Sequence, residues 1–510
     1  MTKDIGSVNA LPDNEKLRFP QTARIGGEEI SLINFRLISL ATFCLALILQ
    51  VVAYQNIEAP FVGIMALFIG YCVFHPKSAV GGRYEREAFL LAFSICYFWA
   101  GVAGIYSVYL EDISQKGDAL WFFGLAANTN DGRSLDQIRA ITSGSGAVFV
   151  WRAIYNFFSA IGFQKGPYIA IAFNTFLVAV SGVFGTKALQ VIFNDDQRRA
   201  ARFILLFSMC GVFWLFAATF LRDSFVLLLN TLLVYVWVRY LTNPTRVTAF
   251  FLIMFSAIAT IAFAYLRTEF LFVPIAMLFA GDVAILIKGR FVRWTALMSV
   301  ILTGLYIAVL PISITDFVNV IASGTAQYKT FANSPENHGS TSTSPENHGS
   351  TSPESHSSSL GVTYVVNQPI LMRLAIGSFY LQIFPIPFWS GMFEGTVYHL
   401  LKSLNAIFMW FVIPFAVLGI YRSWQIKEKP EQTALLFLTV IYAGFSCAVA
   451  GSSLETRHLG SFLLPLLMLA TVPDLRLREN MHIYWRLSGA WFGLTLFVYI
   501  AWFILKHGYF

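Results

Sequence analysis

Charged residues are scarce in this sequence of 510 residues. They make up 12% of the chain, whereas hydrophobic residues make up 56%. A soluble domain carries roughly 25% charged residues, so the composition argues against a soluble enzyme, a nucleic-acid-binding protein and a disordered hub. The net charge of +7 does not indicate nucleic acid, because excess lysine and arginine in an apolar chain marks cytoplasmic loops. The composition predicts a multi-pass membrane protein.

Cysteine is rare, and the motifs of many soluble enzymes are missing. All five cysteines lie inside apolar stretches, so there is neither a disulfide framework nor a Cys/His zinc spacing. The sequence has no Walker A loop, dinucleotide fingerprint, nucleophile elbow or His-Glu-x-x-His motif. We therefore assign no metal site and no cofactor from the sequence, which leaves a metal requirement open. Any energy for a reaction has to come from the substrate or from a gradient.

Long apolar stretches are abundant. A hydrocarbon core about 30 Å thick needs about 20 apolar residues in a helix, and about thirteen stretches are candidates. They are 37–54, 60–75, 88–109, 167–193, 203–220, 224–241, 247–265, 269–287, 294–314, 401–421, 432–450, 459–474 and 487–505. These stretches predict an all-α fold, a polytopic transmembrane helix bundle. The largely polar residues 1–36 contain no cleavable signal peptide.

Lysine and arginine are distributed unevenly between the connections of these spans. With the N-terminus in the cytoplasm, every inside connection between spans carries two or three of them. The short outside turns near 55–59, 221–223, 266–268 and 451–458 carry none or one each. By the positive-inside rule, this pattern predicts a cytoplasmic N-terminus.

This topology divides the sequence into four regions. They are a cytoplasmic tail (1–36), a transmembrane bundle (37–314) with an outer loop (110–166), a second outer loop (315–400) and C-terminal transmembrane helices (401–510). Both loops are predicted to be extracytoplasmic and to contain interfacial helices. Two candidates are 146–163, which carries Arg152, and 370–390, which carries Arg373 and two prolines. We interpret both as interfacial or re-entrant.

A Ser/Pro/His-rich unit repeats within residues 333–359. It begins at Ser334, Ser344 and Ser352, and a histidine recurs with it. Such a composition cannot bury a core, so we expect this segment to be disordered. The histidine spacing matches no standard metal site, and the chemistry of the protein is not expected to depend on the repeat.

Ionisable residues collect on the predicted outer side, at the ends of different spans. Charged groups inside membrane proteins are costly and are often functional. The residues are Glu111, Asp112, Asp118, Arg222, Asp223, Arg267, Glu269, Glu455, Arg457 and His458. A bundle can bring them into one site, although charges at helix ends can also mark the membrane interface. Lys187 and Asp282, which lie within spans, are interpreted as interhelix contacts or snorkelling groups.

Arginines beside acids suit a phosphate-bearing substrate and a hydroxyl acceptor. Arginine binds phosphate oxygens in a bidentate manner and keeps its charge, and a nearby carboxylate can act as a general base. Aromatic residues of the outer loops, such as Trp151, Tyr155 and Trp389, offer faces for sugar rings or form the interfacial belt. Arg152 is a candidate for binding an anion or a lipid headgroup.

Four short motifs follow one another along the predicted outer side. They are Gly-Asp-Ala-Leu-Trp-Phe at 117–122, Leu-Arg-Asp-Ser at 221–224, Phe-Pro-Ile-Pro-Phe-Trp at 384–389, and Arg457-His458 before a span that contains Pro465. Their order resembles that in bacterial membrane glycosyltransferases of the C type and in oligosaccharide repeat-unit (O-antigen) polymerases. The resemblance covers most of residues 88–475. The Ser-rich repeat departs from it, and the early loop lacks the acidic pair of many C-type enzymes, which favours the polymerase branch.

The resemblance implies glycosyl transfer from polyprenyl-(di)phosphate-linked sugars outside a bacterial cytoplasmic (inner) membrane, in surface polysaccharide assembly. It favours polymerisation of repeat units, with other polysaccharide-assembly membrane proteins as candidate partners. The implied general base is Asp118, with Asp112 as the alternative. The implied substrate-binding residues are Arg222 and Arg457 at the lipid phosphate, Asp223 orienting Arg222, His458 at the phosphate or the acceptor, and Arg267 as a further phosphate ligand.

Two alternatives remain. The protein can instead be a single-sugar C-type glycosyltransferase or a glycan ligase, which the sequence does not distinguish from a polymerase. It can also be a lipid-linked oligosaccharide flippase or another transporter. A carrier is expected to have internal repeats and ionisable groups near the midplane. The sequence shows no obvious repeat between its halves, so transfer is favoured.

Overall fold

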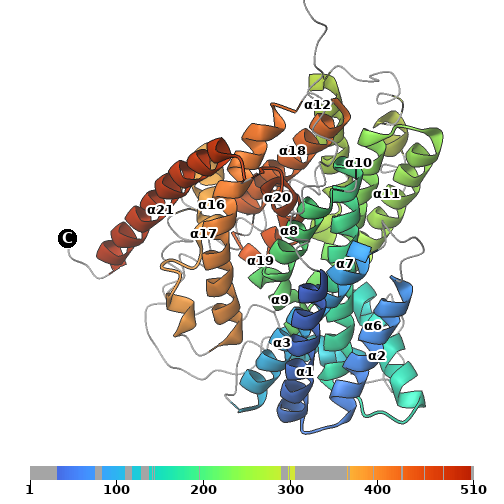
Figure 1. Cartoon of the computed structure of the whole chain (residues 1–510). Coiled ribbons are helices and arrows are strands. Elements are labelled where there is room, and N and C mark those ends of the chain that lie inside the picture. The colour runs from blue at the N-terminus through green and yellow to red at the C-terminus, as the bar shows by residue number, and fades with distance from the viewer. Residues whose placement is uncertain are drawn as a thin grey trace, which may run out of the picture.

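The protein is described here by a computed structural model. It describes residues 32–74, 83–109, 118–127, 137–139, 142, 144–194, 196–288, 297, 299–304, 365, 368–393, 396–426, 429–452, 454–474 and 476–506. Within these ranges the regular structure is helical and no strand occurs (Figure 1). The predicted all-α fold is therefore confirmed for the described residues. The repeat at 333–359 and most of the N-terminal tail lie outside them.

Within the described ranges, eight helices are long and apolar enough to cross a membrane. They are α1 (Leu32–Tyr54), α3 (Arg83–Tyr109), α7 (Pro167–Ile192), α10 (Asp223–Thr242), α11 (Arg246–Leu266), α17 (Val397–Ser423), α18 (Lys429–Ser452) and α21 (Arg478–Lys506). With a rise of about 1.5 Å per residue, twenty residues cover about 30 Å. Helices of this length and composition indicate a lipid bilayer environment and a multi-pass membrane protein.

Two of the predicted spans are broken. The stretch 203–220 falls on α8 (Gln197–Ser208) and α9 (Gly211–Ala218), which are bent by 56° relative to each other. The stretch 459–474 falls on α19 (Thr456–Gly460) and α20 (Leu463–Ala470). Polar and small residues at these sites let neighbouring helices approach closely. A Cβ on Gly211, for example, would lie 2.8 Å from the carbonyl oxygen of Leu401 in α17.

Other predicted spans are short. The helices α2 (Glu58–Val73) and α12 (Val273–Lys288) have 16 residues each, and the single turn η2 (Thr268–Phe270) precedes α12. Most of the stretch 294–314 lies outside the described residues. The described chain therefore supports eight spans, or nine if the bent pair counts as one. The predicted number of thirteen is not confirmed.

Three buried asparagines bind the backbone where helices break. Asn405 of α17 accepts a hydrogen bond from the first turn of α9 at 3.3 Å. Asn174 of α7 donates to two carbonyls of the α9–α10 turn at 3.1 and 3.2 Å. Asn230 of α10 donates to a carbonyl at the α19–α20 junction at 3.2 Å. Because a bilayer offers no water to free backbone groups, each asparagine stabilises one break.

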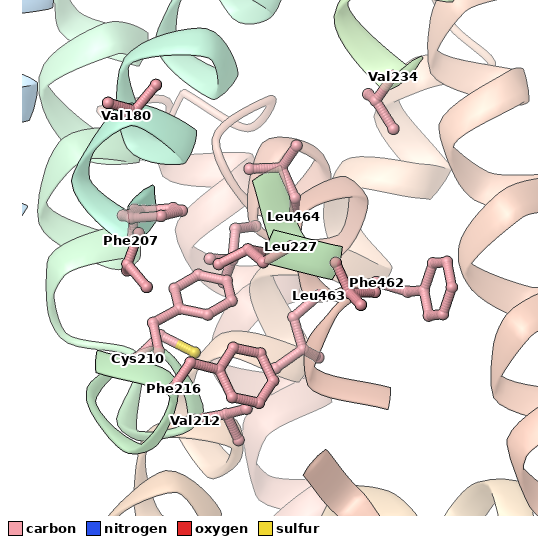
Figure 2. Packing of buried hydrophobic residues seen from close by; sticks show 14 of the residues in the cluster. Val180, Phe207, Cys210, Val212, Phe216, Leu227, Val234, Phe462, Leu463 and Leu464 are labelled. Atoms are coloured by element: carbon pink, nitrogen blue, oxygen red, sulfur yellow. The ribbon is translucent and has the colours of Figure 1, made fainter. Parts of the chain in front are cut away.

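The apolar core surrounds these breaks. Figure 2 shows it between the α8–α9 region, α10 and the start of α20, with Phe207, Val212, Phe216, Leu227, Phe462, Leu463 and Leu464 among its residues. All of these side chains are buried. The rigid packing of α9, α10 and α20 fixes the turns that precede α10 and α19. Of the predicted site residues, Arg222 lies in the turn before α10, Asp223 is the first residue of α10, and Arg457 and His458 lie in α19.

Contacts between helix termini show which of them lie at the same end of the bundle. At the Lys187 end, Lys187 in the last turns of α7 pairs with Glu85 in the first turn of α3 at 3.0 Å. The interhelix role predicted for Lys187 is thus confirmed. Arg422, in the last turn of α17, bonds to the first turn of α21 at 2.6 Å at the same end. At the Arg267 end, Arg267 beyond α11 meets Asp223 at the start of α10.

The segment 370–390 forms a hairpin whose two ends lie at the Arg267 end of the bundle. Its helix α16 (Ile370–Ile383) begins beside the end of α18, where Arg373 donates to the carbonyl of Ala450 at 3.3 Å. It ends near the middle of α18, where Tyr442 donates to Gln382 at 2.7 Å. The chain then returns past η4 (Ser390–Met392), which packs on the first turns of α17. The interpretation of this segment as interfacial or re-entrant stays a prediction.

Candidate functional site

Arg267 is the centre of an ion network between the ends of α10, α11 and α19. Its Nη1 donates to Oδ1 of Asp223 at 2.8 Å, its Nη2 contacts Nε2 of His458, and its Nε lies 3.6 Å from Glu269. The side chains of Arg267 and Asp223 are 7% and 3% exposed, whereas Glu269 is 52% exposed. The structure therefore brings together three predicted substrate-binding residues, Asp223, Arg267 and His458.

Glu455 is the centre of a second network that adjoins the first. Its Oε1 lies 3.3 Å from Nζ of Lys402 and 3.4 Å from Nε of Arg457, and it accepts a hydrogen bond from the Tyr398 hydroxyl. The ammonium of Lys402 also lies 4.0 Å from the centre of the Tyr398 ring. Because Glu455 and His458 are three residues apart on one short segment, the two networks form a single cluster.

Arg222 lies at the N-cap of α10, next to Asp223. Its guanidinium is 5.9 Å from the centre of the Phe122 ring in α4 (Asp118–Ala127). Burial, followed by the charge of Arg267, lowers the pKa of Arg222 to about 10, while Glu269 and Asp223 act in the opposite direction. Arg222 therefore remains charged at neutral pH and belongs to the same electrostatic cluster.

Two further pKa shifts follow from this arrangement. Burial and the charges of Arg267 and Arg457 hold the pKa of His458 well below its ordinary value, so its imidazole is neutral at neutral pH. Burial disfavours the charge of Glu455, but Arg457 and Lys402 outweigh it and hold the pKa of that carboxyl well below its ordinary value. A neutral histidine thus lies among permanently charged groups.

The position of Arg222 is set by a chain of hydrogen bonds from outside the cluster. Nε1 of Trp151, in α6 (Ser145–Ala160), donates to Oδ1 of Asn174 at 3.1 Å. Asn174 donates in turn to the carbonyls of Thr219 and Leu221, directly before Arg222. Trp151 and Asn174 are fully buried. The turn that carries Arg222 is therefore fixed by α6 and α7.

The predicted general bases are only partly accounted for. Asp118 is the first residue of α4, one helical turn before Phe122, so the start of α4 lies near the cluster. The side chain of Asp118 lies outside the described part of the chain, and so does all of Asp112. Both assignments stay predictions. Among the described residues, no group of three His, Cys, Asp or Glu side chains is placed to hold a metal ion.

The structure corrects the interpretation of some outer-loop residues. Trp151 and Tyr155 are fully buried in the bundle, so neither offers a face to a sugar or belongs to an interfacial belt. Arg152, considered as an anion or headgroup ligand, donates to the carbonyl of Leu125 at 2.9 Å and ties α6 to α4. Trp389 is exposed to a large extent and remains a candidate for either role.

Sequence reasoning missed Lys402 and Tyr398. Lys402 lies in the apolar stretch 401–421, and a lysine in such a stretch is an indication of a functional site. Tyr398 precedes that stretch and carries no pattern of its own. Asp282, interpreted as an interhelix contact, accepts a hydrogen bond from Ser299 at 2.6 Å.

The cluster is suited to binding an anion. Among the described side chains of the cluster, four cations (Arg222, Arg267, Lys402 and Arg457) accompany three carboxylates, so positive charge is in excess there. Guanidinium groups match the geometry of phosphate oxygens, and a partly buried setting strengthens the attraction. No protein-family model, curated protein or solved structure matches this chain.

Proposed function

We propose that the protein is a membrane glycosyltransferase that uses polyprenyl-(di)phosphate-linked sugars and acts in surface polysaccharide assembly, where it polymerises repeat units. One observation carries the proposal. Arginines from the α9–α10 turn, the end of α11 and the start of α19, with a lysine of α17, gather at one end of an apolar bundle. A lipid phosphate lies at the same depth, because its chain is in the hydrocarbon and its charged group is at the interface.

The proposed roles follow from charge and position. Arg222, Arg267 and Arg457 bind the lipid phosphate, and Lys402 adds a fourth positive charge. When the site is empty, Asp223 keeps Arg267 in place, and Glu455 keeps Lys402 and Arg457 in place. His458 assists at the phosphate or at the acceptor. Asp118, or alternatively Asp112, takes the proton of the acceptor hydroxyl while the glycosidic bond forms and the lipid (di)phosphate leaves.

The proposed orientation places this site outside a bacterial cytoplasmic membrane. The positive-inside rule assigns the Lys187 end, with its many lysines and arginines, to the cytoplasm. The Arg267 end is then extracytoplasmic. Lipid-linked sugars at that face carry their own leaving group, so the reaction needs no nucleotide.

The test is the surface glycan of cells that lack this gene, separated on a gel and stained for carbohydrate. We expect the long-chain ladder to disappear and single repeat units to remain. Complementation with Arg222→Ala or Asp118→Asn is expected to leave the ladder at least roughly tenfold weaker, since hydrogen bonds to charged groups contribute about 1.5–3 kcal/mol. Arg239→Ala, an exposed arginine at the other end of α10, is the matched control and should restore the ladder.

An unchanged ladder in the deletion strain would argue against polymerisation of that glycan. Loss of a single sugar, or accumulation of complete chains on the lipid carrier, would indicate a single-sugar transferase or a ligase that uses the same site. Full activity of both Arg222→Ala and Asp118→Asn would remove the basis of the proposed mechanism. A flux assay with labelled lipid-linked substrate would identify a transporter.

A further inference from the structure

Buried hydroxyl groups in this chain commonly bond to their own helix. Thr231 of α10 donates to the carbonyl of Leu227 at 2.8 Å, and Thr175 of α7 donates to that of Ile171 at 2.8 Å. Each acceptor is four residues earlier, which is the ordinary partner for a serine or threonine inside a helix. This arrangement satisfies a hydroxyl without a partner from another segment.

Ser224 and Thr456 are buried without such a partner. They are 0% and 6% exposed, and neither side-chain oxygen has a hydrogen-bond partner in the described structure. Ser224 is the second residue of α10 and Thr456 is the first residue of α19. A residue at the start of a helix has no helical carbonyl four residues before it. Their positions therefore explain why back-bonding is not open to them.

Both hydroxyls lie in the segments that carry the cationic cluster. Ser224 follows Asp223, the partner of Arg267. Thr456 lies between Glu455 and Arg457, which pair with each other. The first turn of a helix also has amide groups without intrahelical acceptors, and in α10, a helix of 20 residues, these amides favour an anion. Two buried hydroxyls without partners thus adjoin residues of the cationic cluster in two separate segments.

We propose that Ser224 and Thr456 are ligands of this site and donate hydrogen bonds to phosphoryl oxygens of the bound substrate. The inference rests on the proposed function and deepens it, because it adds neutral donors to the charged ones. Arginine and lysine select the anion by charge. The two hydroxyls fix the orientation of the phosphoryl group by directional hydrogen bonds.

The test compares Ser224→Ala and Thr456→Val with Thr231→Val, a control in α10 whose hydroxyl already has a partner. Purified protein in detergent is titrated with inorganic diphosphate and with a short-chain prenyl diphosphate, and Kd is measured by calorimetry. We expect each site variant to raise Kd roughly tenfold for the prenyl probe. The melting temperature should not fall, because the removed hydroxyl had no partner in the protein. Thr231→Val should lower the melting temperature and leave Kd unchanged.

The outcomes separate the two proposals. If the wild type binds the prenyl probe and both Ser224→Ala and Thr456→Val bind it with the same Kd, the inference is overturned and the proposed function is left intact. Failure of the wild type to bind either probe would overturn both. Tighter binding of the prenyl probe than of inorganic diphosphate supports a lipid phosphate as the ligand. Binding of inorganic diphosphate without binding of the prenyl probe would show that the ligand is not a lipid phosphate.

Discussion

At the residue scale, pairing allows ionisable groups to remain charged between apolar helices. Arg267 and Lys402 are almost fully buried. Arg267 contacts the carboxylate of Asp223, and Lys402 contacts that of Glu455. Removing one partner of a buried pair costs about 3–5 kcal/mol, because the other charge is left without compensation. Truncation of these residues therefore tests folding as well as function. Variants of less strongly coupled residues are more informative about binding.

His458 predicts a pH dependence of anion binding. In the empty site, burial and the guanidinium groups hold its pKa well below the ordinary value. A bound anion offsets the charges of Arg222, Arg267 and Arg457, so the pKa of His458 rises on binding. The complex then binds more protons than the free protein. We expect the affinity for sulfate, which does not titrate near neutral pH, to increase as the pH falls from about 8 to about 5.5.

Isothermal titration calorimetry in buffers of different ionisation enthalpy measures the proton uptake directly. His458→Gln cannot titrate and should bind sulfate with a weaker pH dependence. The acids of the cluster, which are Asp223, Glu269 and Glu455, remain in that variant, so any pH dependence that they cause is still present. His482→Gln, in α21 at the Lys187 end, is the control and should behave as the wild type. Equal proton uptake by His458→Gln and the wild type would contradict this prediction.

The predicted site residues come together because of where they occur along the chain. Arg222, Asp223, Arg267, Arg457 and His458 lie in short connections between apolar stretches, and connections on one side of a bundle share one face. Their pairing partners were harder to predict. Contacts such as Asp223 with Arg267 depend on packing between segments far apart in the sequence, which no local pattern contains.

At the element scale, broken helices determine the shape of the site. An apolar window predicts that a segment is inside the membrane, but it does not reveal where another helix offers a polar group to the backbone. The stretch 203–220 is therefore predicted as one straight span, whereas Asn405 binds the backbone at its break and α8 and α9 are bent. Asn174 acts in the same way before α10. Predicting these breaks needs the contacts between helices.

Replacing Asn174 with leucine is expected to weaken substrate binding. The change removes three hydrogen bonds and frees the turn that positions Arg222. We expect Kd for a short-chain prenyl diphosphate to rise roughly tenfold and the melting temperature to fall. Asn405→Leu is a matched control, because it removes a buried asparagine that supports a different break. It should lower the melting temperature while leaving Kd close to that of the wild type. Equal Kd values for the two variants would argue against a positioning role for Asn174.

At the scale of the whole molecule, the two ends of the bundle differ in their charged groups. At the Lys187 end, lysine and arginine form several separate small groups, such as Arg202 and Arg476 with Asp474. At the Arg267 end, cations and acids form one continuous cluster. The peripheral helix α21 and the N-terminal helices α1 and α2 flank this bundle (Figure 1). The sequence predicts which residues lie at each end, because hydropathy locates the spans and successive connections between spans lie at alternate ends of the bundle.

Single cysteines introduced at the two ends test this topology. Glu269→Cys and Arg476→Cys replace exposed side chains at opposite ends. In a background without the native cysteines, a membrane-impermeant maleimide should label Glu269→Cys on intact cells. Arg476→Cys should react only after the membrane is permeabilised. Labelling of both from the same side would contradict the two-ended bundle, and the reverse pattern would invert the proposed orientation.

The hairpin of α16 also affects which changes of sequence the protein can tolerate in evolution. Because it begins beside the end of α18 and returns to the first turns of α17, both of its ends lie at the Arg267 end of the bundle. Lengthening, shortening or exchanging this hairpin does not invert α17, α18 or α21. The segment beside the cationic cluster can thus vary in length and sequence, while α17, which carries Lys402, keeps its direction.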